Sequence, residues 1–130
     1  MKTLTVVIGI LKNGDNHVLI ALRPPHVSSP GIWEFPGGKV EPNETLEAAL
    51  HREWREEIGI EITRIKPLLS ITHETPEKRL HLHSFEIVSY LGEPRGCESQ
   101  EIRWVPINKL IAYEFPAANM EIIKYLNKEV

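Results

Sequence analysis

Apolar residues recur at helical spacing in one part of the chain, residues 45–58. Four of them, each four positions from the next, form a single stripe on a helix: Leu46, Leu50, Trp54 and Ile58. The interior of this segment has good helix formers and no proline. We therefore predict a helix over residues 45–58, with Asn43 or Glu44 near its start and Gly59 just beyond its end.

Alternating or β-branched runs predict strands on both sides of this helix. The predicted strands are residues 3–11, 17–23, 32–35, 61–75 (as one or two strands), 80–91 and 102–105. A turn at residues 13–16 predicts that the first two strands form a hairpin, and Gly9 predicts a bulge or a close contact in the first strand. A further turn at residues 75–78 joins the two long strands.

Proline marks several of the remaining segments. Residues 24–31 contain three prolines and predict a polar loop, which either closes over a ligand or is a plain connector. Residues 106–111 predict one helical turn, and a last helix follows Phe115 with Pro116 at its first position. Strands on both sides of a central helix, followed by a closing helix, predict an α/β fold whose mixed sheet is covered on both faces.

Composition indicates one globular domain, residues 1–130, because 42% of the residues are apolar and 25% are charged. The net charge of −3 argues against a nucleic acid polymer or a membrane as partner, and a polyanionic substrate would need bridging cations. A single cysteine, Cys97, excludes an internal disulfide. The first residues hold neither a spanning helix nor a signal-like segment, so a cytoplasmic location is expected.

Acidic residues crowd beside the apolar stripe of the predicted helix. Glu53, Glu56 and Glu57 project together at the edge of its buried face. Half-buried carboxylates repel one another and lose hydration unless a cation joins them. One interpretation is a solvated face in which Arg52 pairs with Glu56, and the other is a cation site.

The spacing of these charges favours the cation site. From Gly38 to Ile60 the residues follow the pattern G-x5-E-x7-R-E-U-x-E-E-x-G-U, where U is a bulky apolar residue. This segment resembles the signature of the Nudix hydrolase family, with every fixed position filled. The one departure is Trp54, which is larger than the usual aliphatic residue and puts the local packing in question. The resemblance implies the Nudix α/β/α sandwich with a mixed central β-sheet, in which glycine turn, signature helix and following loop form a metal site.

Cleavage of a phosphoanhydride requires charge neutralisation and a positioned water, which Mg²⁺ supplies while it is bound to a few carboxylates. By resemblance, Mg²⁺ is the cofactor, for which Mn²⁺ could substitute. The implied metal ligands are Glu53, Glu56 and Glu57, with a backbone carbonyl of Gly37 or Gly38 as a helper. Arg52 is expected to fix a carboxylate through its planar fork rather than to touch the substrate.

Two acids compete for the role of general base. Glu53 is the first choice, because an acid beside a metal-bound water is well placed to take its proton. Glu98, in the loop at residues 92–99, is the second, since Nudix enzymes recruit a base or an extra metal ligand from outside the signature. The alternative for Glu98 is an exposed loop acid. Glu44 is expected to support the loop and to reach a metal through water.

Pieces of the sequence outside the signature resemble the MutT-type 8-oxo-dGTP diphosphatases of this family. They are VVIGILKN at 6–13, Arg23, EFPGGKVE at 34–41, GEPRGCESQ at 92–100 and FPAAN at 115–119. By resemblance, Arg23 contacts the substrate, Phe35 helps to wall the base pocket, and Asn119 reads the base edge. The implied reaction converts a nucleoside triphosphate, 8-oxo-dGTP, to 8-oxo-dGMP and pyrophosphate, which sanitises the nucleotide pool and prevents mutation. Attack at the β phosphorus is implied, although composition alone leaves α or β attack open.

Asn119 also has a physical reason to recognise oxidised guanine. Oxidation at C8 turns the N7 acceptor into an N–H donor, and a side-chain amide offers one donor and one acceptor. The amide can therefore complement the oxidised edge with two bonds, whereas ordinary guanine leaves one group mismatched. The alternative is that Asn119 is a first-turn helix residue that bonds its own backbone.

Other features favour cytidine nucleotides. Two segments, RLHLHSFEI at 79–87 and WEF at 33–35, resemble the related CTP and modified-cytidine pyrophosphohydrolases. Those proteins tend to carry an acid at the position of Asn119, which suits the amine donor of cytosine. Thr75 and Arg95 stand where the closest MutT-type proteins tend to carry aromatic residues, so the loops that flank the pocket could close differently.

Further alternatives concern the histidines and the class of protein. His81 and His83 share a strand face at a spacing that could bind zinc, but no third ligand is evident and a structural or pocket-lining role is expected. A non-catalytic nucleotide-binding Nudix module would usually have lost signature acids, all of which this chain keeps. A hydrolase of nucleoside diphosphates linked to another moiety would need recognition segments for which 130 residues leave little room. We expect a monomer, and the number of metal ions stays open.

Overall fold

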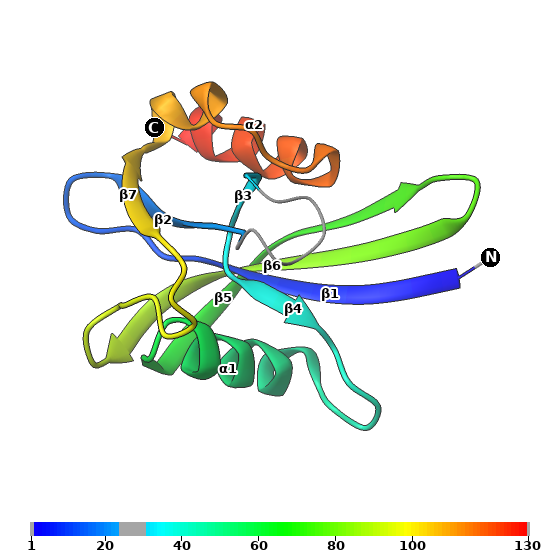
Figure 1. Ribbon diagram of the computed structural model, residues 1–130, viewed down its shortest axis with the longest axis horizontal. Helices are drawn as coiled ribbons and strands as arrows, with labels where there is room; N and C mark the ends of the chain where they lie inside the picture. Colours follow the sequence, from blue (N-terminus) through cyan, green and yellow to red (C-terminus); the bar gives the residue numbers. More distant parts are fainter. Residues whose placement is uncertain (1, 24–30, 130) are drawn as a thin grey trace.

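The computed structural model describes residues 2–23 and 31–129. Its elements are β1 (Lys2–Ile10), β2 (His17–Leu22), β3 (Trp33–Glu34), β4 (Gly37–Lys39), α1 (Leu46–Glu57), β5 (Glu61–Glu74), β6 (Lys78–Leu91), β7 (Ile102–Pro106), the 3-10 helices η1 (Ile107–Ala112) and η2 (Ala117–Asn119), and α2 (Met120–Glu129). Figure 1 shows α1 and α2 on opposite sides of the strands. The predicted α/β fold with helices on both faces is confirmed.

The strands form two sheets, with the orders β4-β1-β6-β5 and β3-β2-β7. In the larger sheet β1 is parallel to β6, from Lys2 beside Lys78 to Ile10 beside Glu86, and antiparallel to β4. The sheet is therefore mixed, as predicted. Strands β5 and β6 form a long antiparallel hairpin whose turn is closed by the Thr75 N–H donating to the Lys78 carbonyl at 2.9 Å.

The predicted hairpin of the first two strands forms only next to its turn, where the Asn13 N–H donates to the His17 carbonyl and the Leu19 N–H to the Leu11 carbonyl, both at 3.0 Å. Oδ1 of Asn13 accepts the N–H groups of Asp15 and His17, both at 3.0 Å. Beyond the turn β1 pairs with β4 and β6 while β2 pairs with β3 and β7, and the two strands meet at an isolated bridge between Lys12 and Val18. Both strands carry runs of buried residues on both faces, and a two-stranded ribbon cannot bury two faces.

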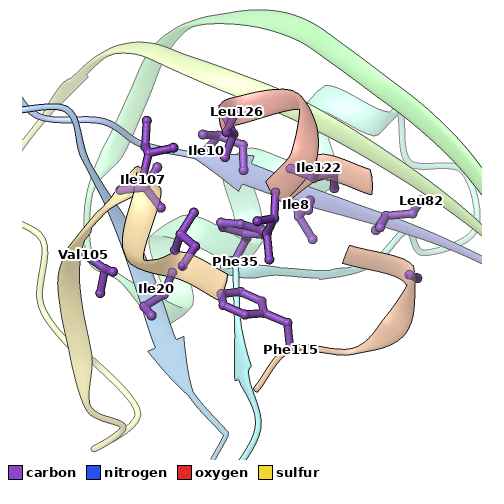
Figure 2. Close-up of a cluster of buried hydrophobic side chains, with 14 residues drawn as sticks. Ile8, Ile10, Ile20, Phe35, Leu82, Val105, Ile107, Phe115, Ile122 and Leu126 are labelled. Atoms are coloured by element: carbon purple, nitrogen blue, oxygen red, sulfur yellow. The ribbon is translucent and has the colours of Figure 1, made fainter. Parts of the chain in front are cut away.

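Two clusters of buried apolar side chains lie between the strands and the helices. The cluster on the α1 side includes Val7, Leu19, Leu50, Trp54, Ile58, Ile62 and Phe85. The cluster on the α2 side, shown in Figure 2, includes Ile8, Ile20, Phe35, Val105, Phe115, Ile122 and Leu126. Adjacent residues of β1, Val7 and Ile8, point to opposite clusters, as the alternation of a strand requires. Strand β1 therefore contributes side chains to both apolar clusters and lies between them.

Helix α1 agrees with the prediction in its interior and at its start. The apolar stripe is fully buried at Leu50, Trp54 and Ile58. The N-cap is Thr45, whose Oγ1 accepts the Ala48 N–H at 3.0 Å, directly after Asn43 and Glu44, which were predicted near the helix start. Asn43 adopts a left-handed conformation (φ 66°) in the preceding turn, and Gly59 follows the helix with φ of 75°.

The C-terminal segment begins one residue later than predicted. Pro116 is the N-cap of η2 rather than the first helical residue. The predicted loop at 24–31 falls, apart from its last residue, outside the described residues, so its role stays a prediction. Within residues 2–23 and 31–129, no helix has the length and apolar character needed to cross a membrane.

Candidate active site

Strand β4 places two glycines where a side chain would not fit. A Cβ on Gly37 would overlap the carbonyl oxygen of Val7 in β1, and a Cβ on Gly38 would lie 2.5 Å from the carboxyl carbon of Glu53 in α1. Glycine at these positions therefore lets the β4 backbone contact both β1 and the acidic face of α1.

Arg52 holds two carboxylates in place beside this backbone. Its Nε and Nη2 donate to the two oxygens of Glu44 at 2.7 and 3.0 Å, and its Nη1 donates to Oε1 of Glu53 at 2.8 Å. Nη2 also donates to the Lys39 carbonyl at 3.1 Å, which ties α1 to β4. Hydrogen bonds from Arg52 and from the Glu41 N–H hold the pKa of Glu44 down at about 2. The planar fork of Arg52 is thus filled by oxygen acceptors of the protein.

Glu56 points towards solvent. Its carboxylate lies 3.4 Å from Nη1 of Arg52, and 56% of its side chain is exposed. The ion pair of a solvated face is therefore present, but the shorter bonds of Arg52 go to Glu44 and Glu53. Among the described residues, no three acidic, histidine or cysteine side chains converge closely enough to hold a metal ion as they stand. A cation shared by these acids would therefore need their side chains to move from this arrangement.

Acids from three segments gather on the inner edge of α1. Burial, a hydrogen bond with Glu53 and the charges of Glu53, Glu34 and Glu98 raise the pKa of Glu57 to about 10. Burial also raises the pKa of Glu34, against the hydrogen bond from Arg23. Carboxyl oxygens that repel one another in a half-buried place are the donor set that a hard divalent cation offsets, so these residues fit Mg²⁺ or Mn²⁺.

Glu98 reaches this cluster because its loop is anchored on the end of α1. The Arg95 N–H donates to the Ile58 carbonyl, and the Cys97 N–H donates to the Glu57 carbonyl, both at 2.9 Å. Nε2 of Gln100 donates to the same Glu57 carbonyl at 3.0 Å. Glu98 is exposed, as its simpler interpretation expected, yet the structure places its charge close enough to act on Glu57.

The three residues expected to bind the substrate, Arg23, Phe35 and Asn119, come from three separate segments of the chain. Nη1 of Arg23 donates to Oε1 of Glu34 at 2.9 Å, on the acid side of β3. Phe35 is buried and packs against Phe115 with ring centroids 5.0 Å apart. Asn119 is 7% exposed, and its backbone N–H donates to the Pro116 carbonyl at 2.9 Å.

The side chain of Asn119 forms no hydrogen bond with the described residues, its own backbone among them. A capping role for this amide is therefore not what the geometry shows. Half-buried apolar side chains border the same cluster from β1, β5, β6 and α2: Val6, Leu69, Ile71, Leu80 and Met120. A buried amide beside apolar surface is a typical arrangement for recognising a flat polar ring.

The sequence pattern of the NUDIX domain matches residues 7–125. The chain belongs to the Nudix family. It is 34% identical over 128 residues to the 8-oxo-dGTP diphosphatase of Escherichia coli K12, covering 98% of this chain and 99% of that protein. It is 35% identical over 124 residues to the CTP pyrophosphohydrolase of the same strain, covering 95% of this chain and 91% of that protein.

Solved structures agree with the Nudix assignment. A MutT structure, from work on Aliivibrio salmonicida and Vibrio cholerae, superposes with a TM-score of 0.87 at 36% identity and covers 99% of this chain and 100% of its own. The solution structure of the E. coli ORF135 protein has a TM-score of 0.83 at 35% identity and covers 95% and 88%. The chain is a Nudix hydrolase with the α/β fold of MutT, and within that family it is a nucleotide pyrophosphohydrolase.

One acid of this Nudix site, Glu34, was missed by the sequence reasoning. It lies within the EFPGGKVE segment, but outside the signature pattern that directed attention to Glu53, Glu56 and Glu57. Strand pairing places Glu34 opposite Ala21, two residues from Arg23. The signal that could have found it is the presence of an acid in a short extended segment shortly before the glycine pair.

The two histidines of β6 form hydrogen bonds with side chains of the neighbouring strand β5. Nδ1 of His83 is 3.0 Å from Oγ of Ser70, and Nδ1 of His81 is 3.2 Å from Oγ1 of Thr72 on the neighbouring strand. They alternate with Leu80 and Leu82, which border or belong to the cluster around Phe35. The histidines therefore lie on the opposite face of the strand from Leu80 and Leu82, where His83 borders a cavity together with Leu46 and Pro67.

Proposed function

We propose that this Nudix hydrolase converts 8-oxo-dGTP to 8-oxo-dGMP and pyrophosphate with Mg²⁺, and thereby sanitises the nucleotide pool and prevents mutation. The observation that carries the proposal is the Asn119 side chain, which is 7% exposed and forms no hydrogen bond with the described residues. Its segment also carries Phe115 and Ala118, which belong to the apolar cluster around Phe35. The full-length similarity to 8-oxo-dGTP diphosphatases supports it.

The base selectivity would depend on whether the bound base offers hydrogen-bond partners to both polar groups of the Asn119 amide. Bound 8-oxoguanine presents an N7–H donor and an O6 acceptor, which the Asn119 carbonyl and NH₂ can satisfy together. Guanine presents two acceptors to the same amide, so one group stays unpaired. An unsatisfied buried group costs about 1–3 kcal/mol, and a bound base would cover the Asn119 amide, which is 7% exposed.

The proposed metal ligands are carboxylates of Glu53, Glu56, Glu57 and Glu98 and a backbone carbonyl of Gly37 or Gly38. Mg²⁺, or Mn²⁺ in its place, would supply charge neutralisation at the phosphates and a more acidic bound water. The crowding that raises the pKa of Glu57 supports a cation in this place, because a cation removes the repulsion that now favours a proton.

The proton of the attacking water would pass to Glu53. The hydrogen bond from Arg52 at 2.8 Å orients the Glu53 carboxylate for this role. Glu98 is the second candidate for the base, since its anchored loop carries it to the same cluster. Arg23 would contact the substrate after leaving or sharing its bond with Glu34.

A cytidine nucleotide is the second candidate substrate. The 35% identity to a CTP pyrophosphohydrolase and the Trp33-Glu34-Phe35 segment favour it. An amide at 119 can rotate to serve either base, so the comparison must be made with substrates.

The deciding experiment measures kcat/KM in Mg²⁺ for 8-oxo-dGTP, dGTP, CTP and 5-methyl-dCTP side by side. We expect 8-oxo-dGTP to exceed dGTP by about a hundredfold or more, equivalent to about 2.7 kcal/mol. Higher values for the cytidine nucleotides would overturn the base assignment while leaving the Nudix chemistry in place. Absence of turnover with all four would favour a nucleotide-binding module.

A further inference from the structure

The indole of Trp54 is hydrogen-bonded inside the core to the turn that precedes the two glycines. Trp54 has no exposed surface, and its Nε1 donates to the Pro36 carbonyl at 2.9 Å. The same carbonyl accepts the Gly9 N–H from β1, also at 2.9 Å. One carbonyl oxygen therefore receives a donor from the helix and a donor from the sheet, which fixes the direction of the Pro36–Gly37 peptide.

Gly9 and Trp54 fit each other as a pair. A Cβ on Gly9 would lie 2.5 Å from Nε1 and 2.7 Å from Cε2 of Trp54, so the ring rests directly on the β1 backbone. This explains the close contact that Gly9 predicted in its strand. An aliphatic side chain at position 54 could fill part of this space, but it could not donate to the Pro36 carbonyl.

The peptide held by Trp54 leads straight into the glycine pair. Gly37 lies against the Val7 carbonyl, and Gly38 lies against the carboxylate of Glu53, which directly precedes Trp54 in the helix. Tight packing on both sides means that a change in the Pro36–Gly37 peptide displaces the β4 carbonyls relative to the helix. The bond from Trp54 therefore links the backbone oxygens of the turn to the carboxylates of α1 through one residue.

We propose that Trp54 is a positioning residue of the metal site, whose indole N–H sets the Gly37–Gly38 carbonyls at the right distance from the α1 carboxylates. The inference rests on the proposed function, in which these oxygens bind Mg²⁺. Groups that orient metal ligands typically change metal affinity or activity by about 10- to 100-fold when they are removed. The family pattern has an aliphatic residue at this position, which could pack in the core but could not donate a hydrogen bond. Trp54 adds the hydrogen bond to the Pro36 carbonyl.

The test compares Trp54→Phe, which keeps an aromatic ring and removes the donor, with wild type for binding of Mn²⁺ alone, without nucleotide, by electron paramagnetic resonance. We expect the Mn²⁺ dissociation constant to rise by about tenfold, with kcat reduced and KM for the nucleotide little changed. The matched control is Ile62→Ala, in the same apolar cluster but on β5 at the opposite edge of the sheet from β4. It should lower the melting temperature and leave Mn²⁺ affinity as in wild type.

A second variant keeps the inference testable if Trp54→Phe destabilises the protein too much for Mn²⁺ binding to be measured. Replacement of Trp54 by its benzothiophene analogue keeps the ring shape and exchanges only the N–H for sulfur, and it should reproduce the loss of Mn²⁺ affinity. Wild-type affinity in Trp54→Phe or in the analogue, or an equal loss in Ile62→Ala, would overturn the inference while the proposed function stands. If wild-type protein binds no Mn²⁺, the proposed metal chemistry fails and the inference fails with it.

Discussion

The two sides of strand β1 differ in how their chemistry is built. On the α1 side, charged groups from a nearly continuous segment, Gly37 to Glu57, are held by short polar contacts such as the 2.7 Å bond from Arg52 to Glu44. On the α2 side, Phe35 and Phe115 come from distant segments and pack against each other in the apolar cluster, and Asn119 follows Phe115 by four residues. The difference separates reaction from recognition: the proposed phosphate chemistry depends on local spacing, and the proposed base selectivity depends on how far-apart segments pack.

Loss of a single carboxylate should break the α1 side most severely. Glu53→Gln removes the proposed base and a proposed metal ligand, so kcat should fall by about 10²- to 10⁴-fold. Cooperative thermal unfolding should persist, because Gln keeps the size of the side chain. Glu47→Gln, on an exposed position of the same helix, is the control and should retain full activity. Near-normal turnover in Glu53→Gln together with loss in Glu98→Gln would transfer the role of base to Glu98.

The neighbouring glycines should respond differently to the same added methyl group. In Gly38→Ala the Cβ meets the movable carboxylate of Glu53, so activity should fall by about 10-fold or more while the melting temperature changes little. In Gly37→Ala the Cβ meets the Val7 backbone, so the free energy of unfolding should fall by about 1–3 kcal/mol. Gly14→Ala, with no atom within 4 Å of the new Cβ, is the control. Equal effects at Gly37 and Gly38 would contradict this division.

On the α2 side, Asn119→Ala should change selectivity more than rate. Loss of the amide should reduce kcat/KM for 8-oxo-dGTP by about 5- to 150-fold, which corresponds to roughly 1–3 kcal/mol, and should reduce it much less for dGTP. Asn127→Ala, which removes an amide from an exposed position on α2, serves as the control. Equal losses for the two nucleotides would show that Asn119 supports the helix start and does not read the base.

The α1 side should also show a pH dependence of stability in metal-free protein. Burial raises the pKa of Glu57 from 4.5 to about 10, so between these values the folded state binds more protons than the unfolded state. Stability from this group is complete below its unfolded pKa and is lost as pH rises towards its folded pKa. The urea midpoint in EDTA should therefore decline between about pH 5 and about pH 9.

Two variants sharpen that measurement. Glu57→Gln should flatten the decline, because the amide does not titrate, and Glu56→Gln on the exposed side of the helix should leave it unchanged. Mg²⁺ should also reduce the slope by taking the place of the proton among the carboxylates. An unchanged slope in Glu57→Gln would mean that the repulsion of the α1 side is relieved by another group.

The sequence by itself determined the features that depend on neighbours along the chain. The α1 helix, its apolar stripe, the Gly59 stop and the turn at 75–78 follow from spacing and backbone preference, which act within a few residues. The Nudix signature is of the same kind, because one helix and one turn bring its acids together. Backbone preference and residue spacing were sufficient to predict elements whose contacting residues lie close together in the sequence.

Only the tertiary structure decided which distant segments meet. It separated β1 and β2 into different sheets, since each needs cover on both faces. It brought Glu34 and Glu98 to Glu57 and placed His81 and His83 beside hydroxyl groups of β5. It also joined Trp54 to Pro36, where the sequence showed only an unusually large apolar residue. Strand pairing and core packing are contacts between residues far apart in the chain, and no local pattern specifies them.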